Sequence, residues 1–246
     1  MWESGFLLFL VTLVAVANET FTGFAGTIIT ITLGANFLPL GQLVPAWVVV
    51  NLALNLYIVL RHRDQVAWGR LFRQIFPAMS LGIVTGAAVY PWVQDWDLKQ
   101  FLGGMVVLFA GRELLLALRR RGPARRPLAA WQAHLWQYLA GVVHAIYATG
   151  GPFLVYSMGG QDLPKSRFRS TICAVWVTCN LVLVTTFLFS HRLTSETLHL
   201  SGYMALAIVP GILGGQFLHE KADELVFRRI VYGLLVLAGA VLIFPR

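Results

Sequence analysis

The sequence predicts an all-α polytopic membrane protein built from two inverted repeats of five elements each. Of its 246 residues, 57% are hydrophobic and only 12% are charged, whereas a soluble domain carries about 25% charged residues. Glu19 is the only Asp, Glu, Lys or Arg between positions 4 and 60. A bilayer explains such a stretch, because about 20 apolar residues cross its hydrocarbon layer and helices satisfy every backbone group there.

Charges, glycines and prolines divide the chain into ten apolar elements. Most are long enough to cross a membrane, but the second and seventh are short and predict broken or re-entrant half-helices at Gly-rich turns. The elements are 4–22, 27–38, 43–60, 74–93, 98–118, 131–149, 151–160, 170–190, 199–218 and 229–245. A basic linker at 119–130 separates a first transmembrane repeat, 1–118, from a second, 131–246.

An internal duplication is predicted by a shift of 125 residues. The shift superimposes Gly26 on Gly151, Pro39 on Pro164 and Asn55 on Asn180 without a gap. A lipid-facing background seldom supplies Gly, Pro and Asn at matching positions, so these coincidences indicate two related halves.

The distribution of Lys and Arg predicts the orientation of these halves. If each short element returns to the side from which it entered, 16 Lys and Arg residues fall on one side and 3 on the other. If each short element completes a span instead, the split falls to 12 against 7. The positive-inside rule therefore favours five passes per half, which insert with opposite orientation, and the cations mark the cytoplasmic face.

The candidate substrate site lies at the two turns where the short elements begin. A helix that starts near mid-bilayer presents free N–H groups and a partial positive charge, which attract an anion without a buried Lys or Arg. The alternative is that the glycines only allow close helix packing. The predicted substrate-binding residues are Thr22, Gly23, Gly26, Thr27, Asn55, Thr149, Gly150, Gly151, Pro152 and Asn180.

Glu19 and His144 occupy equivalent positions in the two halves and are the ionisable residues at the depth of the turns. They carry protons or charge, or they pair with each other to satisfy two costly buried groups. Asn55 and Asn180 bond backbone carbonyls freed at the helix breaks or donate to a substrate oxygen. The threonine hydroxyls near the turns bond a substrate or their own helix.

No catalytic residue, metal site or cofactor is predicted, because the sequence lacks metalloprotease, nucleophile-elbow, phosphate-loop and CxxC patterns. The remaining histidines, His219 among them, are expected at loop or interfacial positions, and tryptophans such as Trp47 at the membrane interface. Cys173 and Cys179 are expected to pack without a disulfide. The expected partners are a small anionic substrate and the lipid bilayer, not nucleic acid, and a homodimer stays open.

The glycine motifs carry a family resemblance. Gly150-Gly151-Pro152-Phe153, Leu163-Pro164-Lys165-Ser166-Arg167-Phe168-Arg169-Ser170-Thr171 and Asn180 resemble the second-half signature of the TauE/SafE family, and Gly23-Phe24-Ala25-Gly26, Pro39 and Asn55 resemble its first repeat. The resemblance implies a bacterial inner-membrane secondary transporter that exports sulfite, sulfoacetate or related organosulfonates by alternating access. A carrier for a carboxylate or a metal ion, and an intramembrane enzyme using Glu19 with His144, are the alternatives.

Overall fold

The computed structural model describes residues 2–34, 38–93, 98–118, 128–147, 150–158 and 163–243. No strand occurs among these residues, which confirms the all-α class. The elements are α1 (Trp2–Thr22), α2 (Gly26–Gly34), α3 (Leu40–Arg61), η1 (Arg63–Gln65), α4 (Trp68–Arg70), η2 (Leu71–Ile75), α5 (Phe76–Val93), α6 (Leu98–Leu118), α7 (Ala130–Tyr147), α8 (Gly151–Met158), α9 (Lys165–Phe189), α10 (Ser195–Ala205), α11 (Ile208–Lys221) and α12 (Glu224–Ile243).

Several of these helices are long and apolar enough to cross a membrane. Within the described residues, four candidate spans are Gly5–Thr22, Gly41–Arg61, Trp68–Val89 and Lys165–Phe189. The pair Ser195–Ala205 and Ile208–Lys221 meets the same criteria together but is bent by 45°. The chain is therefore a multi-pass membrane protein, as the composition predicts.

The two predicted half-helices are present and short. α2 has 9 residues and α8 has 8, so at 1.5 Å per residue each is about 12–14 Å long and covers less than half of a hydrocarbon layer of about 30 Å. Each follows a long helix of its own unit after a short break, α1 before α2 and α7 before α8.

The chain forms two compact units, and each contains helices from both halves of the sequence. Unit 1 consists of Met1–Val66 and Arg169–Lys221, and unit 2 consists of Ala67–Phe168 and Ala222–Arg246. Unit 1 therefore holds α1–α3, most of α9, α10 and α11. The repeats 1–118 and 131–246 group residues by sequence similarity and stay a prediction, and most of the linker lies outside the described residues.

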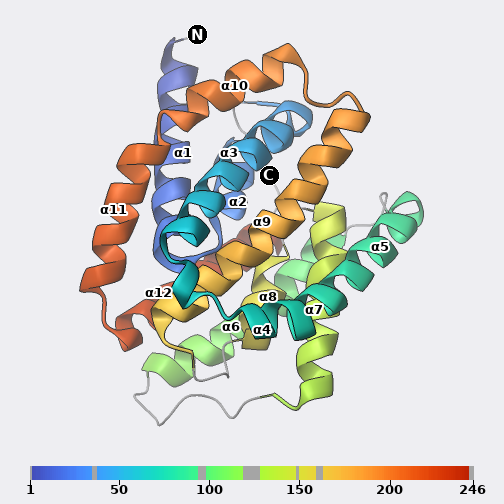
Figure 1. Cartoon of the computed structure of the whole chain (residues 1–246), viewed down its shortest axis with the longest axis vertical. Helices are drawn as coiled ribbons and strands as arrows, with labels where there is room; N and C mark the ends of the chain where they lie inside the picture. Colours follow the sequence, from blue (N-terminus) through green and yellow to red (C-terminus); the bar gives the residue numbers. More distant parts are fainter. Residues whose placement is uncertain are drawn as a thin grey trace. The chain divides into compact units, whose positions relative to one another are not determined.

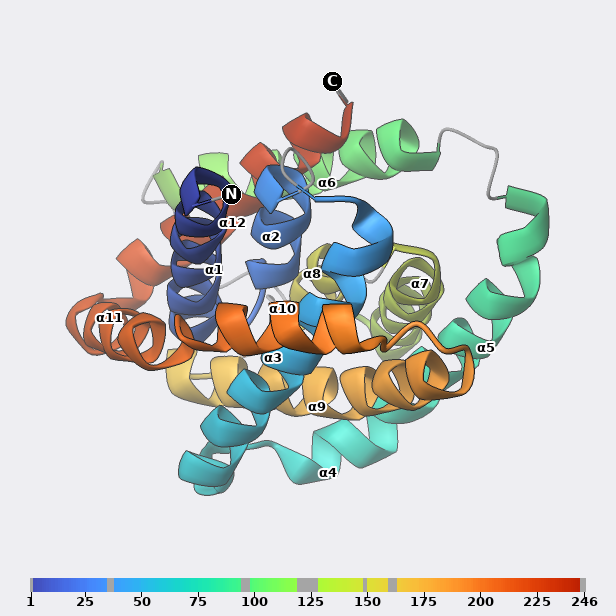
Figure 2. The same cartoon turned by 90° about the horizontal axis from the view of Figure 1, so that it is seen from above.

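In unit 1, α1 and α11 run side by side and approach closely (Figure 1). A Cβ added at Gly215 would lie 2.3 Å from the Ala17 carbonyl oxygen, and one at Gly211 would lie 2.5 Å from Val16 Cγ1. Small residues bring helix backbones together in this way inside membranes. On another side of α1 lies the short helix α2, as the view from above shows (Figure 2).

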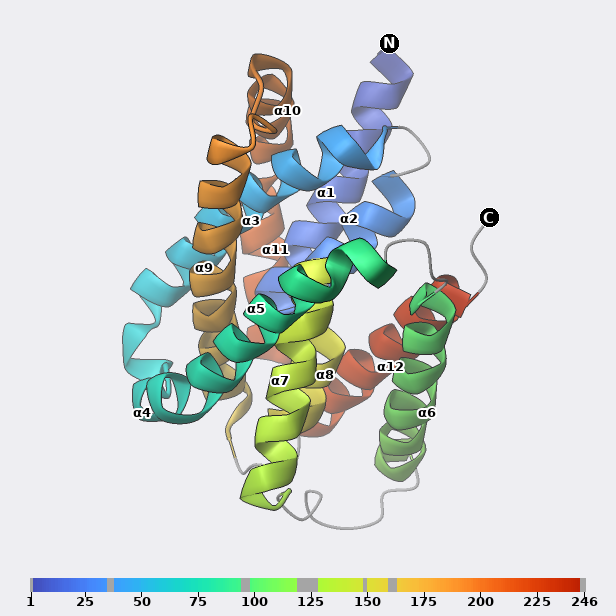
Figure 3. The ribbon, with the colours of Figure 1, turned by 90° about the vertical axis from the view of Figure 1, so that its right-hand side faces the viewer.

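Unit 2 uses the same device where α5 crosses α7 (Figure 3). A Cβ at Gly82 would lie 2.1 Å from the Tyr138 carbonyl oxygen, and one at Gly141 would lie 2.2 Å from the Met79 carbonyl oxygen. In the same view α12 packs along α6, and α8 packs on α7.

Two expectations about element boundaries are wrong. The interval between the expected elements 151–160 and 170–190 predicts a basic loop, but α9 begins at Lys165, so the basic residues of this interval lie in the first turns of a helix. The expected element 199–218 is two helices, α10 and α11, with a bend at 206–207. Pro210 accounts for the bend, because it has no N–H to donate to the carbonyl four residues earlier.

Candidate anion-binding site

The first turn, between α1 and α2, is sharp and needs a left-handed backbone. Gly23 has a φ of +86° and Ala25 a φ of +74°, a region that glycine adopts freely and other L-residues rarely adopt. A Cβ at Gly23 would also lie 3.0 Å from the Arg169 carbonyl oxygen. Gly23 therefore has a structural reason to be glycine besides any contact with a ligand.

Side-chain donors from α9 and α11 satisfy the carbonyls at the end of α1. Arg169 Nη1 donates to the Thr20 carbonyl at 3.1 Å, and Trp176 Nε1 donates to the Gly23 carbonyl at 2.8 Å. His219 Nδ1 donates to the Phe21 carbonyl at 2.9 Å. The last carbonyls of a helix have no partner within the helix, so where they are buried from water they need such donors.

Arg169 and His219 correct two sequence expectations. Arg169 is one of the 16 Lys and Arg residues that the charge distribution assigns to cytoplasmic loops, but it is 1% exposed and also donates to Gln216 Oε1 at 2.9 Å. His219 is expected from the sequence at a loop or interfacial position, but it lies in the last turn of α11 and is 2% exposed. Both follow from the backbone break, since the negative end of the α1 dipole favours a nearby cation and its carbonyls need donors.

At the start of α2, a carboxylate of the chain itself occupies the position that the sequence assigns to a substrate anion. The Gly26 N–H donates to Glu19 Oε2 at 2.7 Å, and Glu19 is 2% exposed. A Cβ at Gly26 would lie 2.7 Å from the same oxygen. Glycine is therefore required for this contact between Glu19 and the helix N-terminus.

A chain of buried amides extends from Glu19 to α9. Asn55 Nδ2 lies 3.4 Å from Glu19 Oε1 and donates to Asn51 Oδ1 at 3.0 Å and to the Asn51 carbonyl at 2.8 Å. Asn180 Nδ2 donates to the same Asn51 Oδ1 at 2.7 Å. The structure thus brings Asn55 and Asn180 together through Asn51, which the sequence reasoning missed. Its position four residues before Asn55, on the same helix face, was the available signal.

The two threonines of the first turn are engaged within unit 1. Thr22 Oγ1 lies 2.9 Å from the Asn18 carbonyl and accepts the Phe24 N–H at 3.2 Å, so it holds the turn. Thr27 Oγ1 accepts from Trp47 Nε1 at 2.9 Å. Trp47 is 0% exposed, so its side chain packs inside unit 1 and does not face lipid or water.

The second turn, in unit 2, repeats part of this arrangement. α8 begins at Gly151, with Pro152 at its second position, and both are buried. A Cβ at Gly150 would lie 2.2 Å from the Ala140 carbonyl oxygen and 3.0 Å from His144 Cβ. His144, 3% exposed, stands seven residues before Gly151, as Glu19 stands seven before Gly26. Thr149 lies outside the described residues.

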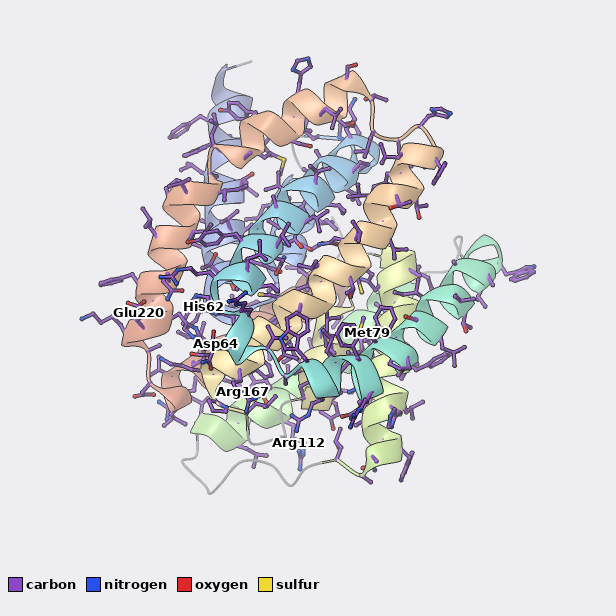
Figure 4. The ribbon with its side chains drawn as sticks, viewed as in Figure 1. His62, Asp64, Met79, Arg112, Arg167 and Glu220 are labelled. Carbon is purple, nitrogen blue, oxygen red and sulfur yellow. The ribbon has the colours of Figure 1, made fainter. Side chains whose placement is uncertain are left out.

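Charged groups gather where α3 and α11 end, and Figure 4 labels His62, Asp64 and Glu220 there. Burial, followed by the positive charges of Arg169 and Arg61, lowers the pKa of His62. Gln216 connects Arg169 to this cluster, because it accepts from Arg169 through Oε1 and donates to Glu220 Oε1 through Nε2 at 2.8 Å.

Chemically, the first turn offers a helix N-terminus, buried amides and hydroxyls, which suit an anion with several acceptor oxygens. Among the described residues, no group of three or more His, Cys, Asp or Glu side chains could hold a metal ion. Cys173 and Cys179 are both buried and free, as expected from their spacing.

Comparison with known proteins gives two matches. A family profile described as "Sulfite exporter TauE/SafE" matches residues 8–242. The chain is also similar to "Probable inner membrane transporter protein TsaS" of Comamonas testosteroni, with 25% identity over 177 residues, which cover 71% of this chain and 72% of the relative. No solved structure matches the chain.

Proposed function

The chain belongs to the sulfite exporter TauE/SafE family, and on this premise we propose that it exports small sulfur-containing anions across the inner membrane by alternating access. The protein is a multi-pass inner-membrane transporter, as its apolar helices and its relative both indicate. The candidate cargo is sulfite, sulfoacetate or a related organosulfonate. These share a compact anionic group whose oxygens accept several hydrogen bonds at once.

The observation that carries this proposal is the buried start of α2. The Gly26 N–H already binds a carboxylate oxygen at 2.7 Å, so this position accommodates an oxyanion. Three helices supply neutral polar groups near this position. They are the Asn55 amide of α3, the Asn180 amide of α9 and the Thr27 hydroxyl of α2. Neutral donors on a helix N-terminus bind an anion without trapping it in a strong ion pair, which suits a carrier that must release its cargo.

We further propose that the two halves are inverted repeats, as carriers with discontinuous helices often are. Under the shift of 125 residues, α1 corresponds to α7, α2 to α8 and α11 to α5. The corresponding helices also make corresponding contacts. α1 contacts α2 and α11, and α7 contacts their counterparts α8 and α5. This recurrence supports a second half-site at Gly150, Gly151 and Pro152, with His144 in the place of Glu19.

Flux of sulfite in proteoliposomes tests the site. Asn180→Leu replaces an amide by an apolar group of similar size, removes the bond to Asn51 Oδ1, and is expected to lower sulfite flux at least tenfold. The matched control is Thr185→Val on the same helix, because that hydroxyl is exposed and donates to the Leu181 carbonyl of its own helix. Wild-type flux in Asn180→Leu, with both variants folded, would remove the amide chain from the site.

A thermal-shift series tests the class of cargo. Ligands that bind the native protein raise its melting temperature, so sulfite and sulfoacetate are expected to do so. Acetate and divalent cations are the comparison ligands. A shift with acetate or a cation, and none with the sulfur anions, would favour a carrier for a carboxylate or a metal ion instead.

A further inference from the structure

We propose that the Glu19 carboxylate is a tethered competitor for the substrate anion: it holds the start of α2 until the anion binds there, and it takes up a proton when the anion replaces it. The inference rests on the proposed function and assigns to that same site its coupling to protons.

A single backbone N–H cannot serve two anions at once. The Gly26 N–H donates to Glu19 Oε2 at 2.7 Å, and Glu19 is 2% exposed. An anion bound at this helix start needs the same N–H. Two neighbouring negative charges away from water also repel strongly. The anion therefore binds well only when the Glu19 side chain gives up the N–H and its negative charge.

A buried hydrogen-bond acceptor without a donor among the described residues lies beside Glu19. Asn55 is 0% exposed, and its Oδ1 has no hydrogen-bond partner among the described residues. The same amide lies 3.4 Å from Glu19 Oε1 through its Nδ2. Buried acceptors without a donor are rare in folded proteins. The hydroxyl of a protonated Glu19 is a donor of the kind this oxygen lacks, so the Asn55 amide serves both forms of the carboxyl group.

Other titratable groups on the neighbouring helices of unit 1 are directed elsewhere, exposed, or represented by a thiol. α2 contains none. Cys173 on α9 is a buried thiol in the neighbourhood of Glu19, whereas Arg169 and His219 are directed at the carbonyls of Thr20 and Phe21. The remaining groups on α3, α10 and α11 are exposed: Tyr57, Arg61, Glu196, His199, Tyr203, Glu220 and Lys221. Glu19 is thus the carboxyl group at the helix start, and Cys173 is the neighbour that a control must address.

The proton balance is simple. One anion enters and one proton from water binds the Glu19 carboxylate, so the carboxyl group becomes neutral as the anion brings its charge. For a singly charged anion, the net charge at the start of α2 is then the same before and after binding. Release of the anion on the other side of the membrane returns the proton to water.

Calorimetric binding of methanesulfonate to the purified full chain tests the proposal, because this anion does not titrate between pH 6 and 8. Titrations at pH 8 in Tris and in triethanolamine, which contain no competing sulfonate or phosphate, give the number of protons taken up per anion bound. We expect about one proton for the wild type, with a Kd that rises by up to about tenfold per pH unit. Glu19→Gln keeps an acceptor oxygen for Gly26 but is expected to take up no proton and to bind with a pH-independent Kd.

Two control variants test whether the proton uptake belongs to Glu19. Glu196→Gln alters an exposed carboxylate on α10 and Cys173→Ala removes the neighbouring thiol, and both are expected to keep the proton uptake. Anion binding by the wild type without proton uptake, which needs no variant to detect, would overturn the competitor role while the proposed function stands. Proton uptake that persists in Glu19→Gln would do the same. If the wild type binds neither methanesulfonate nor sulfite, the proposed function fails, and this inference fails with it.

Discussion

Replacing Arg169 by Met tests how the end of α1 is held by a buried side-chain donor. Methionine keeps much of the apolar stem but removes the guanidinium, whose Nη1 donates to the Thr20 carbonyl at 3.1 Å and to Gln216 Oε1 at 2.9 Å. Because Arg169 is 1% exposed, water cannot easily replace these donors. The Thr20 carbonyl therefore loses a side-chain donor in the variant.

The magnitude follows from the two bonds. A hydrogen bond to a charged group contributes about 1.5–3 kcal/mol, and a buried acceptor left without a donor costs about 1–3 kcal/mol. Part of this loss is offset, because the variant no longer buries a charge whose Nε has no hydrogen-bond partner among the described residues. We therefore expect a net loss of about 2 kcal/mol, which is about 30-fold in the unfolding equilibrium.

The assay is unfolding of the purified protein in mixed micelles with increasing SDS, followed by tryptophan fluorescence and circular dichroism. Arg167→Met is the matched control, since Arg167 lies on the same helix two residues earlier and is exposed. The control is expected to change the free energy of unfolding by less than about 0.5 kcal/mol. Equal stabilities of Arg169→Met and Arg167→Met would refute the account of Arg169 as a cap of α1.

Two further predictions concern helix packing and pH. Gly215→Ala places a Cβ 2.3 Å from the Ala17 carbonyl oxygen, whereas Gly214→Ala meets no atom within 4 Å. Differential scanning fluorimetry should therefore show a lowered melting temperature for Gly215→Ala and an unchanged one for Gly214→Ala. Equal melting temperatures of the two variants would contradict the close approach of α1 and α11. Because the pKa of His62 is lowered in the folded protein, the unfolded chain binds more protons and stability falls as the pH drops through about 6.5. His62→Gln should lose part of the wild-type decrease in melting temperature between pH 7.5 and 5.5, and an unchanged decrease would exclude a contribution from His62.

The half-helices and the polar residues before them could be predicted from the sequence, because their cause is local. Glycines and prolines clustered within an apolar run favour a helix end there, although a single one such as Pro45 lies inside α3. The same logic placed Glu19 and His144 near the breaks, and the structure positions Glu19 against Gly26. The sequence predicted an anion at this helix start, although not that the chain supplies one itself.

The donors that close the end of α1 could not be predicted, because their partners are distant in sequence. A basic residue at the start of an apolar run, such as Arg169, has the same local pattern in a cytoplasmic loop and in a buried cap. Trp47 shows the same limit, since a tryptophan near the end of an apolar run is typical of the interface, and its bond to Thr27 depends on how α2 folds back on α3. The positions of Arg169 and Trp47 depend on contacts with residues distant in sequence, and a hydropathy pattern does not contain that information.

The donors at the end of α1 also have a consequence for how the chain is made. Arg169 and His219 bond carbonyls that precede them by 149 and 198 residues. At about 5–20 residues per second of synthesis, Arg169 emerges roughly 7–30 s after its partner Thr20. During that interval the end of α1 must find temporary donors, from lipid headgroups, water or the insertion machinery. Biogenesis of unit 1 therefore cannot finish before translation of α11, and premature termination upstream of Arg169 would leave a fragment that quality-control proteases can recognise.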